Sequence, residues 1–341
     1  MEEEVKSKGE EETWVVESKE WYLLSYAPNG VPTTDHLKLR TVRLSLQPES
    51  IPHAHLAIET LILSIDPYLR SRFTGNLDGL YFPQFQLDQV ITIFGIGRVK
   101  LSNDSEYKDG DLVLSANFPV AEYCIMPSSE ILEKIDAASG ISLPDYLSSL
   151  GVPGFAAWLG IEVVADPKPG SNVFISAASG GVGMIAGQLA KIRGCRVIGS
   201  TGSDEKVSLL KALFPDGIDV YLDNVGGKIL ESVLNHVNKY ARIPLCGMIS
   251  QYNQQLVVQV WTERYGVRNL LNMVGKEVRM EGYLLNFNRF GEFAKEMGGH
   301  IKEGRVKSKV KINIGIETFL DSLNSLFTGS NVGKVVIQVK A

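Results

Sequence analysis

The chain has 341 residues, of which 44% are hydrophobic and 21% charged, and its formal net charge is −5 from 39 acidic and 34 basic side chains. This composition is ordinary for a globular protein with a sizeable core, and the length favours two domains. No dense cluster of lysine and arginine occurs, so we expect no nucleic-acid partner. No run of about 18 apolar residues occurs, so we expect no membrane partner.

The cysteines and the N-terminus indicate the compartment. Cys124, Cys195 and Cys246 are odd in number and far apart, which argues against a disulfide framework and favours a reducing, cytoplasmic environment. Residues 1–12 are acidic and lack the apolar core of a secretory signal. We expect them to form a disordered tail.

The first part of the chain is typical of a β-rich domain. Short apolar stretches at 55–65, 108–116 and 121–127 are separated by Gly, Pro and Asp, which favours strands joined by turns. Strand patterns return from about Lys307 to the end of the chain. We therefore predict one discontinuous β-rich domain made of residues 1–140 and 307–341.

The middle of the chain, residues 141–306, alternates between strand and helix patterns. Residues 143–164 favour a helix broken at Gly151–Pro153. The alternation that follows predicts an α/β domain with a doubly wound parallel sheet. The predicted strands are 171–177, 195–201, 218–225, 241–247 and 278–285, and the predicted helices are 180–194, 203–214, 228–239, 268–275 and 288–304.

A glycine-rich loop joins the first of these strands to the first helix. Ala178, Gly180 and Gly183 occupy the glycine positions of G-x-G-x-x-G, and Ser179, Gly181 and Val182 complete the loop. Such a loop lets a pyrophosphate approach the backbone and the helix N-terminus. The alternative is a tight turn that binds nothing.

The end of the second strand indicates which dinucleotide is bound. An NAD site carries an acid about twenty residues after the first glycine, but here Ser200 and Thr201 stand there. Lys206 lies just beyond, in a helix with Ser203 as its expected N-cap. This pattern favours the ribose 2′-phosphate of NADPH, although Lys206 could be an ordinary exposed lysine.

The sequence does not predict a metal. His53 and His55 could face one side of a strand, but a third ligand is not evident nearby. Reducing an activated double bond needs no metal, because hydride can add to the β carbon while a phenol or backbone donor stabilises the developing enolate.

Eight motifs in order carry a family resemblance: "DPYLRSR", "GVPGFAAW", "SAASGGVG", "GSDEKV", "FPDGIDVYLDNVGG", "CGMISQYN", "VRMEGYLL" and "NVGK". From about residue 20 the chain resembles the zinc-free medium-chain reductases of the alkenal double-bond reductase and prostaglandin reductase group, with a closer likeness to the plant members. The resemblance implies a GroES-like domain and a Rossmann domain with the active site between them. It also implies NADPH-dependent reduction of α,β-unsaturated aldehydes or ketones by a cytoplasmic homodimer.

The resemblance also implies roles for individual residues. Tyr252 matches the family tyrosine beside the nicotinamide ribose and the substrate carbonyl, and it is the candidate for enolate stabilisation or proton donation. Lys206 matches the residue that grips the 2′-phosphate. Tyr68 and Tyr81 are candidates for the substrate side. The remaining cofactor contacts implied are Pro67, Asn224, Cys246, Tyr283, Leu284, Leu285 and Asn331.

One segment departs from the family pattern. Between Lys211 and the strand at 218–225, relatives carry roughly twenty more residues, a strand and a helix at the sheet edge. Without them, strand 195–201 becomes an edge strand. A right-handed crossover then moves the following helix to the opposite sheet face, with Val207, Leu210 and Leu213 as its apolar stripe. We expect weakened NADPH affinity.

Two alternatives stay open at this point. The same fold could serve a quinone or carbonyl reductase. The short segment also allows a catalytically weak relative that acts as a binding or dimerisation protein.

Overall fold

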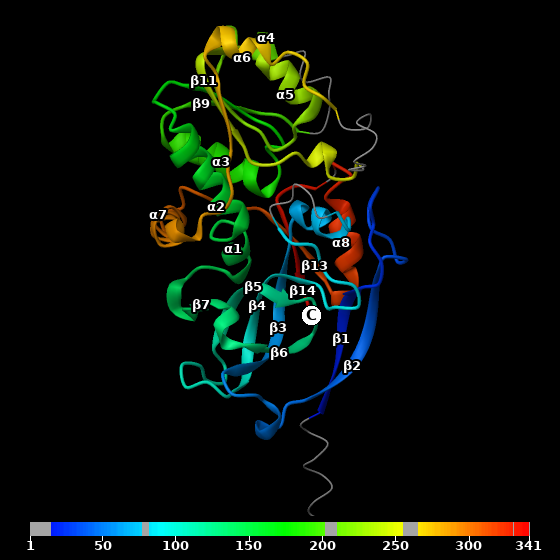
Figure 1. Cartoon of the computed structure of the whole chain (residues 1–341). Coiled ribbons are helices and arrows are strands. Elements are labelled where there is room, and N and C mark those ends of the chain that lie inside the picture. The colour runs from blue at the N-terminus through cyan, green and yellow to red at the C-terminus, as the bar shows by residue number, and fades with distance from the viewer. Residues whose placement is uncertain (1–14, 77–81, 202–209, 255–264, 330, 341) are drawn as a thin grey trace, which may run out of the picture.

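The computed structural model describes residues 15–76, 82–201, 210–254, 265–329 and 331–340. The predicted acidic tail lies outside these residues. Figure 1 shows two layered regions, with the parallel sheet and its helices at one end and the antiparallel strands at the other. The last strands of the chain, drawn in red, lie beside the early strands, drawn in blue and cyan.

The β-rich region contains a seven-stranded sheet. Its main path runs β13-β14-β3-β4-β5-β7, and β6 pairs with β3. The C-terminal strand β14 pairs antiparallel with β3, so an early and a late segment of the chain share one sheet. The late strands β13 and β14 therefore belong to the same sheet as β3–β7, while the predicted discontinuous domain with boundaries at 140 and 307 stays a prediction. The strands are β3 (His55–Ile65), β4 (Thr92–Ser102), β5 (Leu112–Pro119), β6 (Tyr123–Pro127), β7 (Ile131–Ile135), β13 (Val310–Ile314) and β14 (Lys334–Gln338).

A long hairpin of β1 (Val15–Leu23) and β2 (Leu37–Ser45) lies against this sheet. Its Trp21 ring packs against Phe319 with centroids 5.8 Å apart and donates from Nε1 to the Ile316 carbonyl at 2.8 Å. Phe319 begins α8 (Phe319–Ser325). The hairpin and α8 thereby close one apolar core, because both present aromatic rings to the buried face of the sheet.

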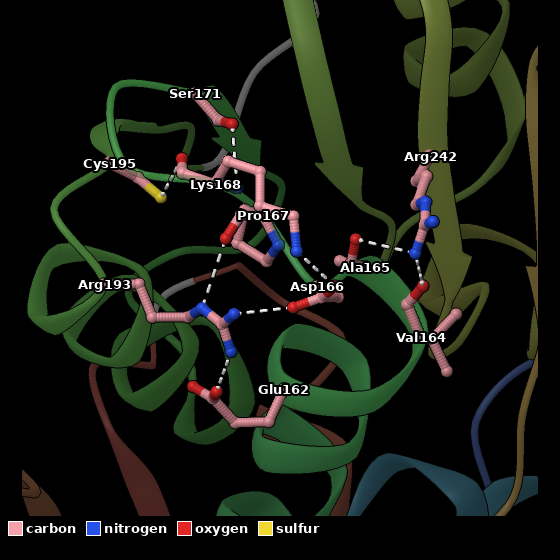
Figure 2. A network of polar contacts seen from close by, with 10 residues as sticks. All are labelled: Glu162, Val164, Ala165, Asp166, Pro167, Lys168, Ser171, Arg193, Cys195 and Arg242. Atoms are coloured by element: carbon pink, nitrogen blue, oxygen red, sulfur yellow. Dashed lines mark hydrogen bonds and ion pairs between the residues drawn. The ribbon is translucent and has the colours of Figure 1, made fainter.

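The connection between the two regions is helical. The predicted break is present: α1 (Leu143–Leu147) ends before Gly151, and α2 (Val152–Trp158) runs directly into the π-helical segment η6 (Leu159–Ala165). Figure 2 shows how the end of η6 is held. Arg193 bonds Glu162 and reaches Asp166 at 2.6 Å. Arg242 Nη1 donates to the Ala165 carbonyl at 3.3 Å, which satisfies an acceptor at the helix end.

The second sheet is parallel throughout and has the order β12-β11-β10-β8-β9 in the described residues. This confirms the predicted doubly wound sheet. The predicted strand β9 is at its edge, as expected from the shortened segment. The strands are β8 (Asn172–Ile175), β9 (Arg196–Gly199), β10 (Ile218–Leu222), β11 (Val237–Leu245) and β12 (Arg279–Gly282).

The two faces of this sheet are covered by different helices. Helix α3 (Gly181–Ile192) buries Ile185 and Leu189 in the cluster that contains Val173 and Ile175. Phe214, which follows α4 (Leu210–Leu213), lies in the other cluster with Phe174 and α5 (Gly227–Leu234). The chain after β9 therefore crosses to the opposite face, as the handedness rule requires.

Two details of the sequence prediction are wrong. Leu213 is 39% exposed, and the adjacent Phe214, at 1%, makes the packing contact instead. Residues 237–239 are not the end of a helix, because Val237 starts β11 and pairs with Ile218. Val207 of the predicted stripe lies outside the described residues.

The remaining described helices are short, apart from one. They are α6 (Leu271–Lys276), α7 (Phe290–Lys302) and the 3-10 turns η2 (Pro48–Ser50), η3 (Pro67–Phe73), η4 (Ser128–Glu130), η5 (Ala137–Ser139), η8 (Ile249–Gln251), η9 (Phe287–Arg289) and η10 (Ile316–Thr318). Within the described ranges, none of the helices has the length and apolar character needed to cross a bilayer.

Candidate active site

The predicted cofactor residues follow the carboxyl ends of four parallel strands. Ala178 comes three residues after β8, Asn224 two residues after β10, and Cys246 and Tyr283 directly after β11 and β12. Carboxyl ends of parallel strands meet at one edge of a sheet, which is where such sheets bind ligands. The topology thus gathers at one edge residues that are more than 100 positions apart in sequence.

The glycine loop is tightly built. Gly180 N donates to the Ala177 carbonyl at 3.0 Å, and Ala177 itself has φ +49°. A Cβ on Gly183 would lie 2.5 Å from the Ala177 oxygen, so only glycine lets α3 begin this close to the strand. The first motif position holds Ala178 instead of glycine. Its methyl group fits because the residue opposite is Gly199, and a Cβ added to Gly199 would come within 2.3 Å of the Ala178 Cβ.

The N-terminus of α3 suits an anionic group. Its N-cap is Gly180, which has no side chain to occupy the first-turn N–H groups of a twelve-residue helix. Gly181 faces Pro153, where an added Cβ would be 3.2 Å from the proline ring. Ser179 accepts at its carbonyl from Gly333 N at 2.7 Å. The loop is therefore rigid and contacted by both regions, and its residues fit a dinucleotide pyrophosphate.

Asn224 is fixed by a buried network that the sequence did not reveal. Its Nδ2 donates to the Ser176 carbonyl at 2.8 Å and its main-chain N to Ser176 Oγ at 3.0 Å. The neighbouring Asp223 is fully buried, and its Oδ1 accepts from Tyr221 Oη at 2.6 Å and from Gly226 N at 2.8 Å. Burial raises the pKa of Asp223, and its Oδ2 accepts no hydrogen bond from the described residues.

Cys246 and Tyr283 are in contact. Tyr283 Oη donates to the Ala156 carbonyl at 2.8 Å and lies beside the Cys246 thiol. Burial raises the pKa of Cys246 to about 11, so the thiol is protonated at neutral pH. Of the two residues that follow, Leu285 packs against the core and Leu284 is 58% exposed.

Tyr252 lies at the end of η8. Its phenol oxygen accepts from Met248 N at 3.2 Å. A Cβ on Gly247 would be 2.8 Å from this oxygen, so glycine there lets the ring fold back over the loop backbone. The half-buried phenol is thereby held near the strand ends that carry Asn224 and Cys246.

Pro67 and Tyr68 begin η3, directly after β3. The Tyr68 ring lies 4.7 Å from the Phe82 ring and packs at the edge of the β-rich core. Asn331 is placed near the C-terminal strand, with its Nδ2 3.2 Å from Ser325 Oγ. Two residues later, Gly333 contacts Ser179, which brings this segment to the glycine loop.

The remaining candidates are those expected to line the substrate side, to lie near the 2′-phosphate or to hold a metal. Tyr81, Ser203 and Lys206 lie outside the described residues. His55 Nδ1 is 2.9 Å from the His53 carbonyl, a contact within one turn. The described parts of the chain contain no group of three or more His, Cys, Asp or Glu side chains arranged to hold a metal ion.

Besides Asp223, sequence reasoning missed further buried charged residues next to the candidates, among them Asp66, Arg70 and Lys334. Asp66 pairs with Lys334, and Arg70 is buried on η3. All three lie inside the family motifs "DPYLRSR" and "NVGK", and membership of these motifs was the sign in the sequence that they could matter to the site. Their partners are distant in sequence, so the pairing itself could not be derived.

Comparisons with known proteins point to one family. Residues 19–135 match the family described as the N-terminal domain of oxidoreductase. The chain is 36% identical over 350 positions to the NADP(+)-dependent 2-alkenal reductase of Nicotiana tabacum, covering 95% of this chain and 98% of that protein. It is 34% identical to the (+)-pulegone reductase of Mentha piperita, covering 95% and 99%. The crystal structure of CurA from Vibrio vulnificus in complex with NADPH superposes with a TM-score of 0.81 at 30% identity, covering 95% and 99%.

The alignment with the tobacco enzyme spans 350 positions, although this chain has only 341 residues. Some positions of the relative are therefore unmatched here, which agrees with the predicted loss of a segment. Similarity at this level along nearly the whole of both chains shows the family. The chain belongs to the NADP-dependent 2-alkenal reductase group of the zinc-independent medium-chain dehydrogenases and reductases.

Proposed function

We propose that this NADPH-dependent oxidoreductase reduces the α,β carbon–carbon double bond of unsaturated aldehydes or ketones. The observation that carries the proposal is the gathering of Ala178, Asn224, Cys246 and Tyr283 at the carboxyl edge of one parallel sheet, next to the loop of Tyr252. The names of the relatives, a 2-alkenal reductase and a pulegone reductase, support the same substrate class.

The glycine loop would hold the pyrophosphate of NADPH. The first-turn N–H groups of α3 would donate to its phosphate oxygens, and the tight turn at Ala177–Gly180 would keep the backbone close to them. Lys206 would bind the 2′-phosphate. When bound, NADPH supplies the hydride that adds to the β carbon of the substrate.

Tyr252 would stabilise the negative charge that develops on the carbonyl oxygen. Its phenol oxygen accepts a hydrogen bond from Met248 N, and its phenol O–H is the donor that would stabilise an oxyanion. The α carbon then takes its proton from solvent or through Tyr252. Tyr68 and Tyr81 would line the substrate side.

We also propose a cytoplasmic homodimer acting on small molecules. The three cysteines are free thiols, which is consistent with the reducing compartment in this proposal.

One observation favours a second candidate, a relative with weak cofactor binding. In the described residues β9 is the edge strand, so the edge strand and helix that extend this side of the sheet in other family members have no counterpart beside it.

A cofactor titration followed by product analysis tests the proposal. We expect saturable nicotinamide fluorescence changes with NADPH and a much weaker response with NADH. With enones and enals we expect the saturated carbonyl compound. An alcohol or a hydroquinone would instead indicate carbonyl or quinone reduction. A folded protein without saturable NADPH binding would favour the second candidate.

A further inference from the structure

Arg70 is a buried cation in the interior of the β-rich region. It lies on η3, two residues after Tyr68, and its side chain is completely buried. Its Nη2 donates to the Ala27 carbonyl at 2.7 Å, and its Nε to the Gly30 carbonyl at 2.7 Å and to Asn253 Oδ1 at 3.0 Å. Among the described residues, Nη1 has no hydrogen-bond partner and Arg70 forms no ion pair with a carboxylate.

The partners of Arg70 come from two regions of the fold. Ala27 and Gly30 belong to the connection between β1 and β2, whereas Asn253 directly follows Tyr252. Gly30 N also donates to the Asn253 carbonyl at 3.0 Å. Asn253 is therefore tied through both its side chain and its main chain. We call Arg70, Ala27, Gly30 and Asn253 the Arg70 clamp.

A buried guanidinium without a counter-ion is costly. Burial lowers the pKa of Arg70 to about 10, which reflects the penalty for keeping the charge in the interior. A methionine of similar length would avoid the cost of burying a charge, but it would donate none of these hydrogen bonds. The planar fork of arginine offers donors in fixed directions, and here it reaches both sides of the junction at once. The buried charge of Arg70 is therefore explained by its hydrogen bonds, which fix the orientation of the Tyr252 loop.

We propose that Arg70 is a positioning residue for the reductase reaction, holding the loop of Tyr252 against the β-rich region through Asn253. This rests on the proposed function, because the benefit of the clamp is the location of the Tyr252 phenol relative to the residues of η3. The clamp acts on Tyr252 through the adjacent residue and does not itself touch the reacting atoms.

The primary variant is N253A, which removes the side-chain acceptor and leaves Arg70 with its two carbonyl partners. We expect kcat for an enone to fall about tenfold, because small displacements of catalytic groups cost large factors. The dissociation constant of NADPH should change less than about threefold, because N253A leaves the glycine loop intact.

R70M and R70K extend the test. R70M removes the donor from three oxygen acceptors, of which the Ala27 carbonyl is buried, and can prevent folding, which is why N253A comes first. R70K keeps a cation and should recover part of the kcat lost in R70M. In a double-mutant cycle, R70K and N253A should be non-additive, because both break one contact.

The matched control is N324A. Asn324 Nδ2 donates to the Pro32 carbonyl at 2.9 Å, so it ties the same β1–β2 connection from α8 without contacting Asn253. We expect wild-type kcat for N324A. An active wild type with unchanged kcat in both N253A and R70M would overturn the proposal, as would an equal loss in N324A.

Hydrogen exchange separates failure of the clamp from failure of the proposed function. If the wild type reduces no enone, the proposed function fails, but the clamp still predicts faster amide exchange over residues 248–254 in N253A than in N324A. Equal protection of this segment in the two variants would overturn the clamp whatever the activity.

Discussion

The Lys334 ammonium and the Asp66 carboxylate form an ion pair in the interior, with Nζ and Oδ1 2.6 Å apart and side chains only 3% and 6% exposed. Lys334 Nζ also donates to the Ile65 carbonyl at 2.6 Å, and Ser64 Oγ donates to Asp66 Oδ2 at 2.5 Å. The pair joins the start of β14 to the end of β3. Lys334 follows Gly333, which contacts the glycine loop, and Asp66 precedes Pro67.

Breaking this pair should destabilise the protein strongly. K334M leaves the Asp66 carboxylate buried without its cation, and removing one partner of a buried pair typically costs about 3–5 kcal/mol. Urea unfolding followed by circular dichroism measures the change. D66L/K334M, which removes both charges, should recover part of the loss. An unchanged unfolding midpoint in K334M would contradict the prediction.

An exposed ion pair is the control for K334M. Arg289 and Glu292 are 2.7 Å apart on the surface, with side chains 34% and 56% exposed. Because solvent screens such a pair, E292Q, which leaves Arg289 over the Trp158 ring, should cost no more than about 1 kcal/mol.

Gly183 should be required for cofactor binding. In G183A the new Cβ would lie 2.5 Å from the Ala177 oxygen and 2.7 Å from the Ala178 Cα, so the loop or α3 must shift. We expect the dissociation constant of NADPH, measured by fluorescence, to rise about tenfold or more, or about 1.4 kcal/mol.

Gly187 lies on the same helix and provides the control for G183A. A Cβ there would be 3.7 Å from Ile175 Cδ1, an ordinary contact. G187A should leave NADPH affinity unchanged and slightly increase stability, because alanine favours helix over glycine. Equal effects of the two substitutions on affinity would show that the loop geometry does not govern binding.

The buried carboxylate of Asp223 should make stability depend on pH. Burial raises the pKa of Asp223 in the native state above the ordinary value of 3.8. At a pH between the ordinary pKa and this raised pKa, the native state therefore keeps a proton on Asp223 that the unfolded state has released. Stability therefore falls as pH rises through this window and stays lower above it. D223N removes this dependence. From pH 4 to pH 8, the free energy of unfolding of D223N relative to that of wild type should therefore rise, by about 1.4 kcal/mol for each pH unit that separates the unfolded-state and native-state pKa values of Asp223.

Y221F sharpens the Asp223 prediction. The Tyr221 phenol donates to Asp223 Oδ1 at 2.6 Å and opposes the rise of the Asp223 pKa. Without it, the loss of stability with rising pH should be larger than in wild type. Parallel pH–stability curves for wild type and D223N, from chemical unfolding at each pH, would rule out a role for the Asp223 proton.

Cys246 should resist alkylation in the native protein. With its pKa raised to about 11, very little thiolate is present at pH 8. Modification by iodoacetamide should be about two orders of magnitude slower than that of an ordinary thiol. Peptide mass spectrometry measures the rate, and the same reaction in urea serves as the reference. Rapid native labelling of Cys246 would contradict the assigned environment.

The sequence alone determined the parts of the molecule that depend on neighbouring residues. The strand, the glycine loop and the start of α3 follow one another within about a dozen positions, and the requirement for glycine at Gly183 arises from Ala177 and Ala178 in the same turn. Strand–helix alternation predicted the parallel sheet, and the short segment after Lys211 predicted β9 at its edge.

Local pattern was misleading where tertiary contacts competed with it. Residues 228–239 have a helical pattern, but α5 ends at Leu234, because Val237 joins the parallel sheet beside Ile218. In the same way Phe214, not Leu213, packs on the sheet, because the crossover to the opposite face sets which side of this short helix is buried.

Only the tertiary structure decided which charged and polar groups meet. Asp66 and Lys334 are 268 positions apart, and Arg70 and Asn253 are 183 apart. No periodicity links such pairs, since each forms only when two distant segments pack and exclude water from between them. The sequence therefore determined the glycine loop and the type of sheet, whereas the packing of the two regions decided the Asp66–Lys334 pair and the contact between Arg70 and Asn253.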